Sequence, residues 1–228
     1  MQLIPHIINH QTFILSPQRC MFWQEENTLV TSDLHIGKTG HFRKYGIAVP
    51  QAVFKEDMQR LLDQITFFKA DKLIVVGDMF HSVANKELDL FKRWRNDMPQ
   101  LKIHLVKGNH DILKADHYNN MDIIMHQEYL SIGNINFQHD VSTIQNQLTT
   151  NNYIISGHIH PGVSISGIGK QSLRFPCFYF GKNYAVIPAF SRFTGLANVK
   201  QNKGDNVYAI VMPPNPLKGE LASLIKIK

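Results

Sequence analysis

The chain has 228 residues, of which 43% are hydrophobic, so it can bury a full core and fits one large domain over residues 1–228. Its net charge of +6 and pI near 9.3 favour anionic partners, and its two cysteines, Cys20 and Cys177, provide neither a disulfide framework nor a CxxC pair for structural zinc. Residues 1–15 lack a signal-peptide pattern and no run of about 18 apolar residues occurs, so we expect a cytoplasmic protein without membrane contact.

The chain begins with a predicted β-meander followed by a βαβ unit. Short apolar runs separated by polar turns predict the strands of the meander, at 13–15, 20–23 and 29–32. A loop that contains glycine and basic residues is expected over 37–44. Pro50 then begins a predicted helix in which apolar residues recur every three or four positions, at Phe54, Met58, Leu61, Ile65 and Phe68. A strand at 73–76 completes the βαβ unit.

The second half of the chain changes from α/β to mostly antiparallel β. A helix is predicted from about Asn85, a plausible N-cap, to Asp97, followed by a strand at 103–106 and an irregular segment at 112–120. Gly133 and Asn134 form the turn of a predicted hairpin over 129–139. Further strands are predicted at 153–156, 163–168, 173–180, 184–187, 207–212 and 221–227.

A series of aspartate, asparagine and histidine residues follows the predicted strands. Each member comes shortly after an apolar run, and open α/β sheets place their sites in loops that leave the carboxyl ends of such strands. Five strand ends therefore point oxygen and nitrogen ligands toward one place. The ligands are Asp33, His35, Asp78, Asn109, His139, His158 and His160.

These side chains predict a particular kind of metal site. Carboxylate, carboxamide and imidazole groups without thiolates suit a catalytic site for manganese, iron or zinc. The ligands are too numerous for one ion, but they divide between two ions if one carboxylate bridges them. Two ions roughly 3.5–4 Å apart can hold a bridging hydroxide and clamp both the attacking and the leaving oxygen of a phosphoryl displacement. The pattern therefore predicts phosphoester hydrolysis.

Four motifs in this order resemble those of the calcineurin-like metallophosphoesterases. They are Asp-x-His at 33–35, Gly-Asp at 77–78, Gly-Asn-His-Asp at 108–111 and Gly-His-x-His at 157–160. The resemblance implies a mixed α/β fold of four layers, αββα, in which two mixed β-sheets lie face to face with helices outside. We expect two divalent ions as cofactors, manganese first, with zinc or iron as the alternatives.

Carried over motif by motif, the resemblance also implies a role for each site residue. One metal would be held by Asp33, His35, Asp78 and His160, and the other by Asp78, Asn109, His139 and His158. Asp78 would bridge the two ions. His110 would stabilise the oxyanion or protonate the leaving oxygen, and Asp111 would orient His110.

A narrower resemblance covers almost the whole chain. The N-terminal meander with Trp23 and four later stretches are similar to the bacterial ligase-associated DNA damage response endonucleases, at 28–38, 77–82, 158–161 and 188–195. This resemblance implies DNA as the substrate and an ATP-dependent DNA ligase and a helicase as partners. The chain departs from the wider superfamily at His81, where many members carry a carboxylate, a difference that the endonucleases share, and from the endonucleases at Leu196, where a second glycine is expected.

Five further residues are candidates for contact with the substrate or with the metal ligands. Lys38, Arg43 and Lys44 would lie on the same edge as the ligands, although basic residues in a loop more often face solvent only. His81 is a candidate partner of a ligand, and Arg192 belongs to one of the stretches that resemble the endonucleases.

Three functions remain open from the sequence. A DNA phosphodiesterase and a hydrolase of small phosphoesters, such as a cyclic nucleotide or a nucleotide-linked precursor, would use the same chemistry. An open basic groove would favour nucleic acid, and a lidded apolar pocket would favour a small substrate. A non-catalytic scaffold is disfavoured because all seven ligands and His110 are intact.

Overall fold

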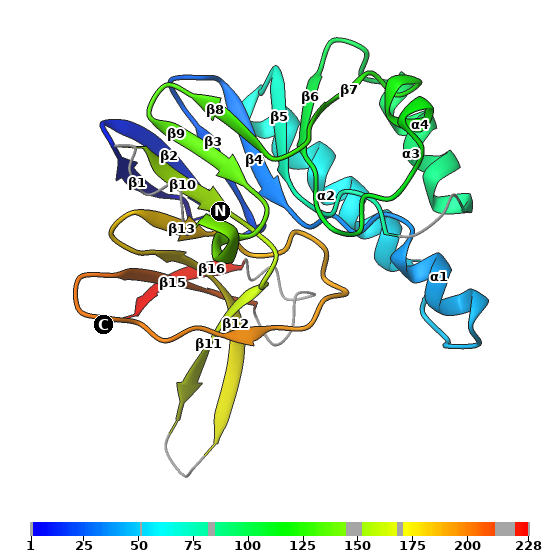
Figure 1. The fold of residues 1–228 in the computed structure, drawn as a ribbon. Coiled ribbons are helices and arrows are strands. Elements are labelled where there is room, and N and C mark those ends of the chain that lie inside the picture. The colour runs from blue at the N-terminus through cyan, green and yellow to red at the C-terminus, as the bar shows by residue number, and fades with distance from the viewer. Residues whose placement is uncertain are drawn as a thin grey trace.

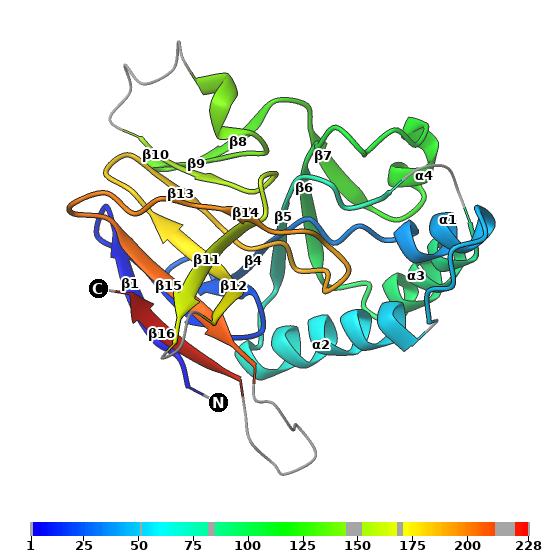
Figure 2. The same ribbon diagram turned by 90° about the horizontal axis from the view of Figure 1, so that it is seen from below.

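The computed structural model describes residues 2–50, 52–81, 85–144, 152–167, 171–212 and 222–227. Two β-sheets lie against each other, and the described α-helices lie on the far side of the first sheet (Figures 1 and 2). None of the described helices has the length and apolar content needed to span a bilayer.

The first sheet has its strands side by side in the order of the sequence. In the described residues these are β1 (Ile4–Ile8), β2 (Gln11–Ser16), β3 (Cys20–Trp23), β4 (Thr28–Ser32), β5 (Lys72–Val76), β6 (Lys102–Val106) and β7 (Ile123–His126). Strands β1 to β4 form an antiparallel meander, and β4 to β7 are parallel. The predicted meander and βαβ unit are confirmed, whereas β1 and β7 were not predicted.

The helices confirm two predictions and correct two others. Helix α2 (Ala52–Phe68) buries its predicted apolar face, and Asn85 caps α3 (Lys86–Asn96) by accepting a hydrogen bond from the Glu87 N–H at 3.0 Å. The prediction of a loop over 37–44 is wrong, because α1 (Lys38–Lys44) occupies it. The prediction of an irregular segment at 112–120 is also wrong, because it contains α4 (Ala115–Asn119), whose Tyr118 is buried.

Contacts from α3 explain why α1 is helical. The Glu87 carboxylate accepts hydrogen bonds from the Gly37 N–H at 3.0 Å and from the Thr39 hydroxyl, and it forms an ion pair with Arg43 at 2.7 Å. Three groups, two at the start of α1 and one near its end, are thus held by one buried residue of another helix. A local sequence pattern does not contain this information.

The second sheet is mixed and carries the C-terminal half of the chain. Its described strands are β8 (Tyr129–Ile132), β9 (Ile135–Gln138), β10 (Tyr153–Ser156), β11 (Pro161–Ser166), β12 (Ser172–Phe180), β13 (Tyr184–Val186), β14 (Ala197–Asn198), β15 (Asn206–Val211) and β16 (Ser223–Ile227). They follow the order β14-β11-β12-β13-β10-β9-β8, with β15 and β16 added beside β12. The predicted hairpin and strands are confirmed, except that residues 168 and 221 lie outside the described residues.

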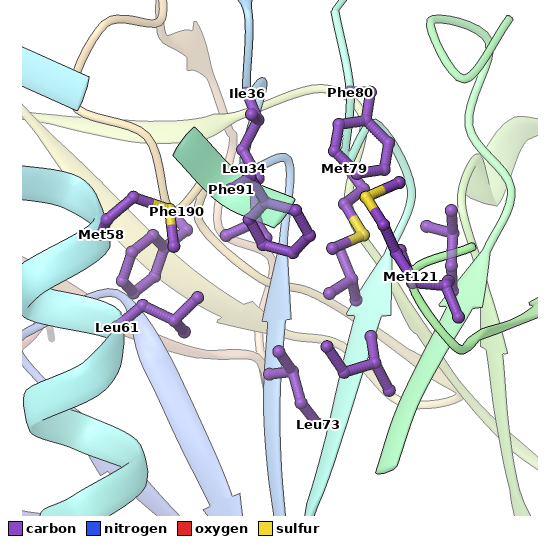
Figure 3. Packing of buried hydrophobic residues seen from close by; sticks show 14 of the residues in the cluster. Leu34, Ile36, Met58, Leu61, Leu73, Met79, Phe80, Phe91, Met121 and Phe190 are labelled. Carbon is purple, nitrogen blue, oxygen red and sulfur yellow. The ribbon is translucent and has the colours of Figure 1, made fainter. Parts of the chain in front are cut away.

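Two hydrophobic cores lie on the two faces of the first sheet. Figure 3 shows part of the core between this sheet and the helices, where Met58 and Leu61 of α2 approach Phe190. The other core lies between the two sheets and includes Trp23 and Phe137, whose ring centroids are 5.9 Å apart. The predicted two-sheet sandwich is therefore confirmed.

A smaller hydrophobic cluster lies on the outer face of the second sheet. Cys177, Tyr179, Val186 and Val207 form a cluster there, against which Val141 of the 3-10 helix η1 (Val141–Ile144) packs. Within the described ranges, η1 and irregular chain take the place of a thick helical layer on this side.

Candidate metal centre

The predicted ligands gather where the carboxyl ends of strands from both sheets meet. Asp33, Asp78 and Asn109 follow β4, β5 and β6 of the first sheet. His139 and His158 follow β9 and β10 of the second sheet. Because β4, β5 and β6 are parallel, as are β9 and β10, their ends bring these loops to a common edge.

Five of the ligands hold an unusual backbone conformation. Their φ angles are positive, with values of 49° at Asp33, 48° at His35, 41° at Asp78, 68° at His158 and 51° at His160. For residues other than glycine this left-handed conformation costs roughly 1–2 kcal/mol each, and it persists where surrounding contacts fix it. Backbone hydrogen bonds provide such contacts here, from the Asp33 N–H to the Gly77 carbonyl at 3.2 Å and from the His35 N–H to the Asp78 carbonyl at 2.9 Å.

One ligand cluster consists of Asp33, His35 and His160, whose ligand atoms all lie within 4.8 Å of one another. His160 Nε2 is 3.3 Å from His35 Nε2 and 3.8 Å from Asp33 Oδ1. Asp33 is fully buried, and its Oδ1 atom has no hydrogen-bond partner among the described residues. A buried, unpaired carboxylate oxygen beside two imidazoles fits a bound cation.

The other cluster consists of Asp78, His139 and His158, and Asn109 adjoins it. His139 Nε2 lies 3.0 Å from His158 Nδ1, 3.1 Å from Asn109 Oδ1 and 3.6 Å from Asp78 Oδ1. One imidazole nitrogen carries at most one hydrogen and cannot satisfy three such neighbours. Atoms bonded at about 2.1 Å to a common ion are themselves separated by roughly 3–3.5 Å, so the spacing fits a metal.

The two clusters are adjacent. The other ring nitrogen of His139, Nδ1, is 3.9 Å from Asp33 Oδ1.

Burial, followed by the charges of Lys38 and His160, lowers the pKa of His35 to about 2. His35 is therefore a neutral imidazole at physiological pH, which is the form that binds a metal.

His110 and His81 lie beside the ligands. The His110 N–H donates to Asp78 Oδ1 at 2.9 Å, and the ring centroid of His110 is 5.6 Å from that of His35. The His81 ring is closer still to His110, with centroids 4.4 Å apart, and burial lowers the pKa of His81 to about 4. The structure thus places the predicted catalytic imidazole next to the centre.

Asp111 makes different contacts from those predicted. Its buried carboxylate accepts hydrogen bonds from the backbone N–H groups of Phe80 and Gly108 at 2.9 Å each and of Met79 at 3.4 Å. None of its hydrogen bonds within the described ranges goes to the His110 ring, so an orienting role would act through the backbone of the loop and not through the ring. Asp111 points back between the loops after β5 and β6 and fixes their backbones instead.

The predicted basic residues separate into two groups. Lys38 begins α1, where its backbone N–H donates to the His35 carbonyl at 3.0 Å; burial lowers the pKa of its ammonium group, and the charges of Asp78 and Asp33 oppose that shift. Arg43 pairs with Glu87 at 2.7 Å and Lys44 is exposed, both on α1. Arg192 lies toward α2, 3.9 Å from Glu56.

The sequence analysis missed Arg60, which holds a neighbouring loop in place. Arg60 is buried on α2, forms an ion pair with Asp57 at 2.7 Å and donates a hydrogen bond to the Phe190 carbonyl. The Phe190 N–H in turn donates to the Ser32 carbonyl at 2.8 Å, directly before Asp33. Asp57 and Arg60 lie three positions apart beside the apolar face of the predicted helix, which is the signal that could have identified them.

Two glycines allow the ligands to come together. A Cβ atom at Gly77, whose φ is 84°, would lie 1.7 Å from His139 Nδ1, and one at Gly108 would lie 2.2 Å from Asp78 Oδ1. Both distances are far below van der Waals contact. The glycines before Asp78 and Asn109 are therefore required by the close approach of the side chains.

Comparison with known proteins identifies a family and similar folds. The family model for calcineurin-like phosphoesterases matches residues 27–220. The crystal structure of Pseudomonas putida nuclease MPE is similar, with a TM-score of 0.77 and 26% identity over 91% of this chain and 96% of that chain. The E. coli phosphoesterase Yfce aligns with a TM-score of 0.45 and 14% identity over 88% of this chain and 97% of its own. No curated protein gave a significant match.

The Gly77 geometry leads to a prediction about metal binding. Gly77→Ala should displace the His139 ring and lower the affinity for metal at least about 10-fold, as loss of a supporting contact does in other metal sites. Metal titration by calorimetry provides the measurement. Gly204→Ala is the matched control, because Gly204 also has a positive φ, of 98°, but a Cβ there meets nothing within 4 Å. Equal effects of the two changes would show that backbone strain, and not the collision with His139, is responsible.

Proposed function

Because the chain belongs to the calcineurin-like phosphoesterase family, we propose that it is a metal-dependent phosphodiesterase that cleaves DNA. The observation that carries this proposal is the pair of adjacent ligand clusters, Asp33, His35 and His160 in one and Asp78, His139 and His158 in the other. Adjacent sites of this composition are suited to the displacement of one phosphate oxygen by another.

The side chains of the centre would hold two divalent ions, for which manganese is proposed first and zinc or iron as alternatives. Asp78 would be shared between the ions, and Asn109 would complete the cluster that contains His139. When bound, the ions supply positive charge for the phosphate oxygens and acidify the attacking water.

His110 is proposed as the group that acts on the leaving oxygen. Its imidazole would donate a proton to that oxygen or stabilise the negative charge on the phosphate. The hydrogen bond from its backbone to Asp78 fixes the position of His110 relative to the ligands, and the Asp111 carboxylate braces the same loop. Lys38, whose ammonium group interacts with the charges of Asp78 and Asp33, would offset the charge of a further phosphate oxygen.

The choice of DNA rests on the surroundings of the centre. The proposed ligand Asn109 is exposed, and so is Ile112 three residues later, by 63%, so this side of the centre faces solvent. The net charge of +6 favours a polyanion. The similarity to nuclease MPE points in the same direction. By the narrower sequence resemblance, a role in cytoplasmic DNA repair beside a ligase and a helicase is part of the proposal.

A matrix of metals and substrates tests the proposed reaction. We expect hydrolysis of bis-p-nitrophenyl phosphate and nicking of DNA, strongest with manganese, and slower hydrolysis of the p-nitrophenyl monoester and of cyclic nucleotides. The rates with manganese, zinc and magnesium should be measured on all of these substrates. Cleavage of the small diester without binding or nicking of DNA at low salt would exclude the nuclease proposal and favour a small phosphoester as substrate.

The proposed sharing of Asp78 between the two ions predicts the metal content of two variants. Asp78→Asn removes a negative charge from both ions and should reduce the metal content well below about two equivalents, whereas Asn109→Ala should leave about one equivalent firmly bound. Elemental analysis of the purified variants measures both values. Retention of the wild-type metal content by Asp78→Asn would rule out the bridging role.

The role of His110 predicts a purely kinetic defect. His110→Ala should lower kcat by about 10²–10⁴-fold while KM and metal content stay close to the wild-type values, since the imidazole acts on the transition state and binds no metal. Steady-state kinetics on the small diester, with elemental analysis of the same sample, provide the measurement. Loss of metal together with activity would identify His110 as a ligand.

A further inference from the structure

A row of aromatic rings leads from the metal centre along α1 to the surface. The ring of the ligand His35 is 5.3 Å from that of His81, measured between centroids. His81 is 5.7 Å from His41 of α1, and His41 is 4.8 Å from Tyr45 at the end of that helix. Three ring-to-ring contacts therefore connect the centre with Tyr45.

Tyr45 is exposed but held in position. It is 70% exposed, and its N–H donates to the carbonyls of His41 at 3.3 Å and Phe42 at 3.1 Å, which fixes the backbone at the end of α1. The Phe42 ring packs edge-on against Phe193 at 5.4 Å, so a neighbouring side chain anchors this end of the helix. An aromatic ring with this exposure adds little to the stability of the fold, since stabilisation follows the apolar area removed from water.

The charges on α1 match a phosphate backbone that passes along the helix. Lys38 at its start follows the ligand His35, whose carbonyl accepts a hydrogen bond from the Lys38 N–H at 3.0 Å, and the exposed Lys44 directly precedes Tyr45. Arg43 is held by Glu87, so it fixes the helix and leaves the two lysines to face a ligand. Cationic groups that follow a backbone, combined with an aromatic face on which a base can stack, are the features of sites for unpaired nucleic acid.

We propose that Tyr45 stacks on an unpaired nucleobase of the strand whose phosphate is cleaved at the metal centre, a few nucleotides from the scissile bond. The occupant is a polynucleotide because the row of rings leads from the metal centre to Tyr45, and lysines stand at both ends of the helix along which it runs. This inference rests on the proposed function, and it assigns the substrate contact to one residue of α1.

Abasic substrates test the stacking directly. Tyr45→Ala and the wild type are compared on a single-stranded oligonucleotide and on the same oligonucleotide with a block of tetrahydrofuran residues on both sides of the cleaved bond. With intact bases, Tyr45→Ala should lower kcat/KM roughly 5- to 50-fold, chiefly through KM. On the abasic block the two proteins should differ by less than about 2-fold, because the stacking partner is missing from both reactions. Tyr45→Trp should restore cleavage of the intact strand.

A second exposed aromatic residue serves as the control. Phe67 is 57% exposed in the last turn of α2, which leads to the start of β5 at Lys72, and so it lies at the opposite edge of the sheet from the centre. Phe67→Ala should leave both kcat/KM values unchanged. An equal loss for Tyr45→Ala on the intact and abasic strands, or no loss on either, would overturn the stacking proposal. Failure of the wild type to cleave bis-p-nitrophenyl phosphate or any DNA would instead reject the proposed function itself.

Discussion

The architecture of the centre depends on the fixation of one residue, Asp33, by three separate segments. Its N–H donates to the Gly77 carbonyl at 3.2 Å, and its own carbonyl accepts from the Ser191 N–H at 3.2 Å. Its Oδ2 atom accepts from the His158 N–H at 3.1 Å. The loop after β5, the loop after β10 and the segment after β13 therefore meet at Asp33, so a single buried residue joins the two sheets at the edge where the ligands gather.

This arrangement buries the carboxylates of Asp33 and Asp78 where hydrogen bonds from the protein satisfy only part of each group. Asp33 and Asp78 are both buried, and removal of a carboxylate from water costs several kcal/mol unless hydrogen bonds or cations replace the water. Backbone N–H groups satisfy one oxygen of each, from His158 and His110, while Asp33 Oδ1 lacks a hydrogen-bond partner in the described ranges. Divalent ions would offset this cost, so metal binding and the stability of the loops are coupled. Five of the ligands also hold positive φ angles, a costly conformation that the hydrogen bonds around them maintain.

The sequence predicts the parts of the molecule that follow from local pattern. A few neighbouring residues are enough to predict the buried strands, the apolar face of α2 and the ligands that follow the strand ends. The structure brings the seven ligands together. Strand β1 was missed because Pro5 and His6 interrupt its apolar pattern. The partners of Asp111 and Arg60 were missed because each depends on backbone groups distant in the sequence, such as the Phe80 N–H and the Phe190 carbonyl. Contacts of this kind exist only after the sheets have come together.

Helix α1 shows that contacts invisible to local sequence patterns also matter for function. Its residues carry weak helical signals, and it forms because two residues of the α3 region hold the backbone of Gly37. The Glu87 carboxylate accepts a hydrogen bond from the Gly37 N–H at 3.0 Å, and the Asn85 side-chain amide donates one to the Gly37 carbonyl at 2.9 Å. The motif residues that supply the chemistry thus lie at strand ends, where sequence patterns are strong. The side chains proposed to contact the substrate, Lys38 and Tyr45, lie on a helix whose existence depends on tertiary contacts. Substitution of Glu87 in α3 is therefore expected to move the helix proposed to contact the substrate, while the ligands at the strand ends stay in place.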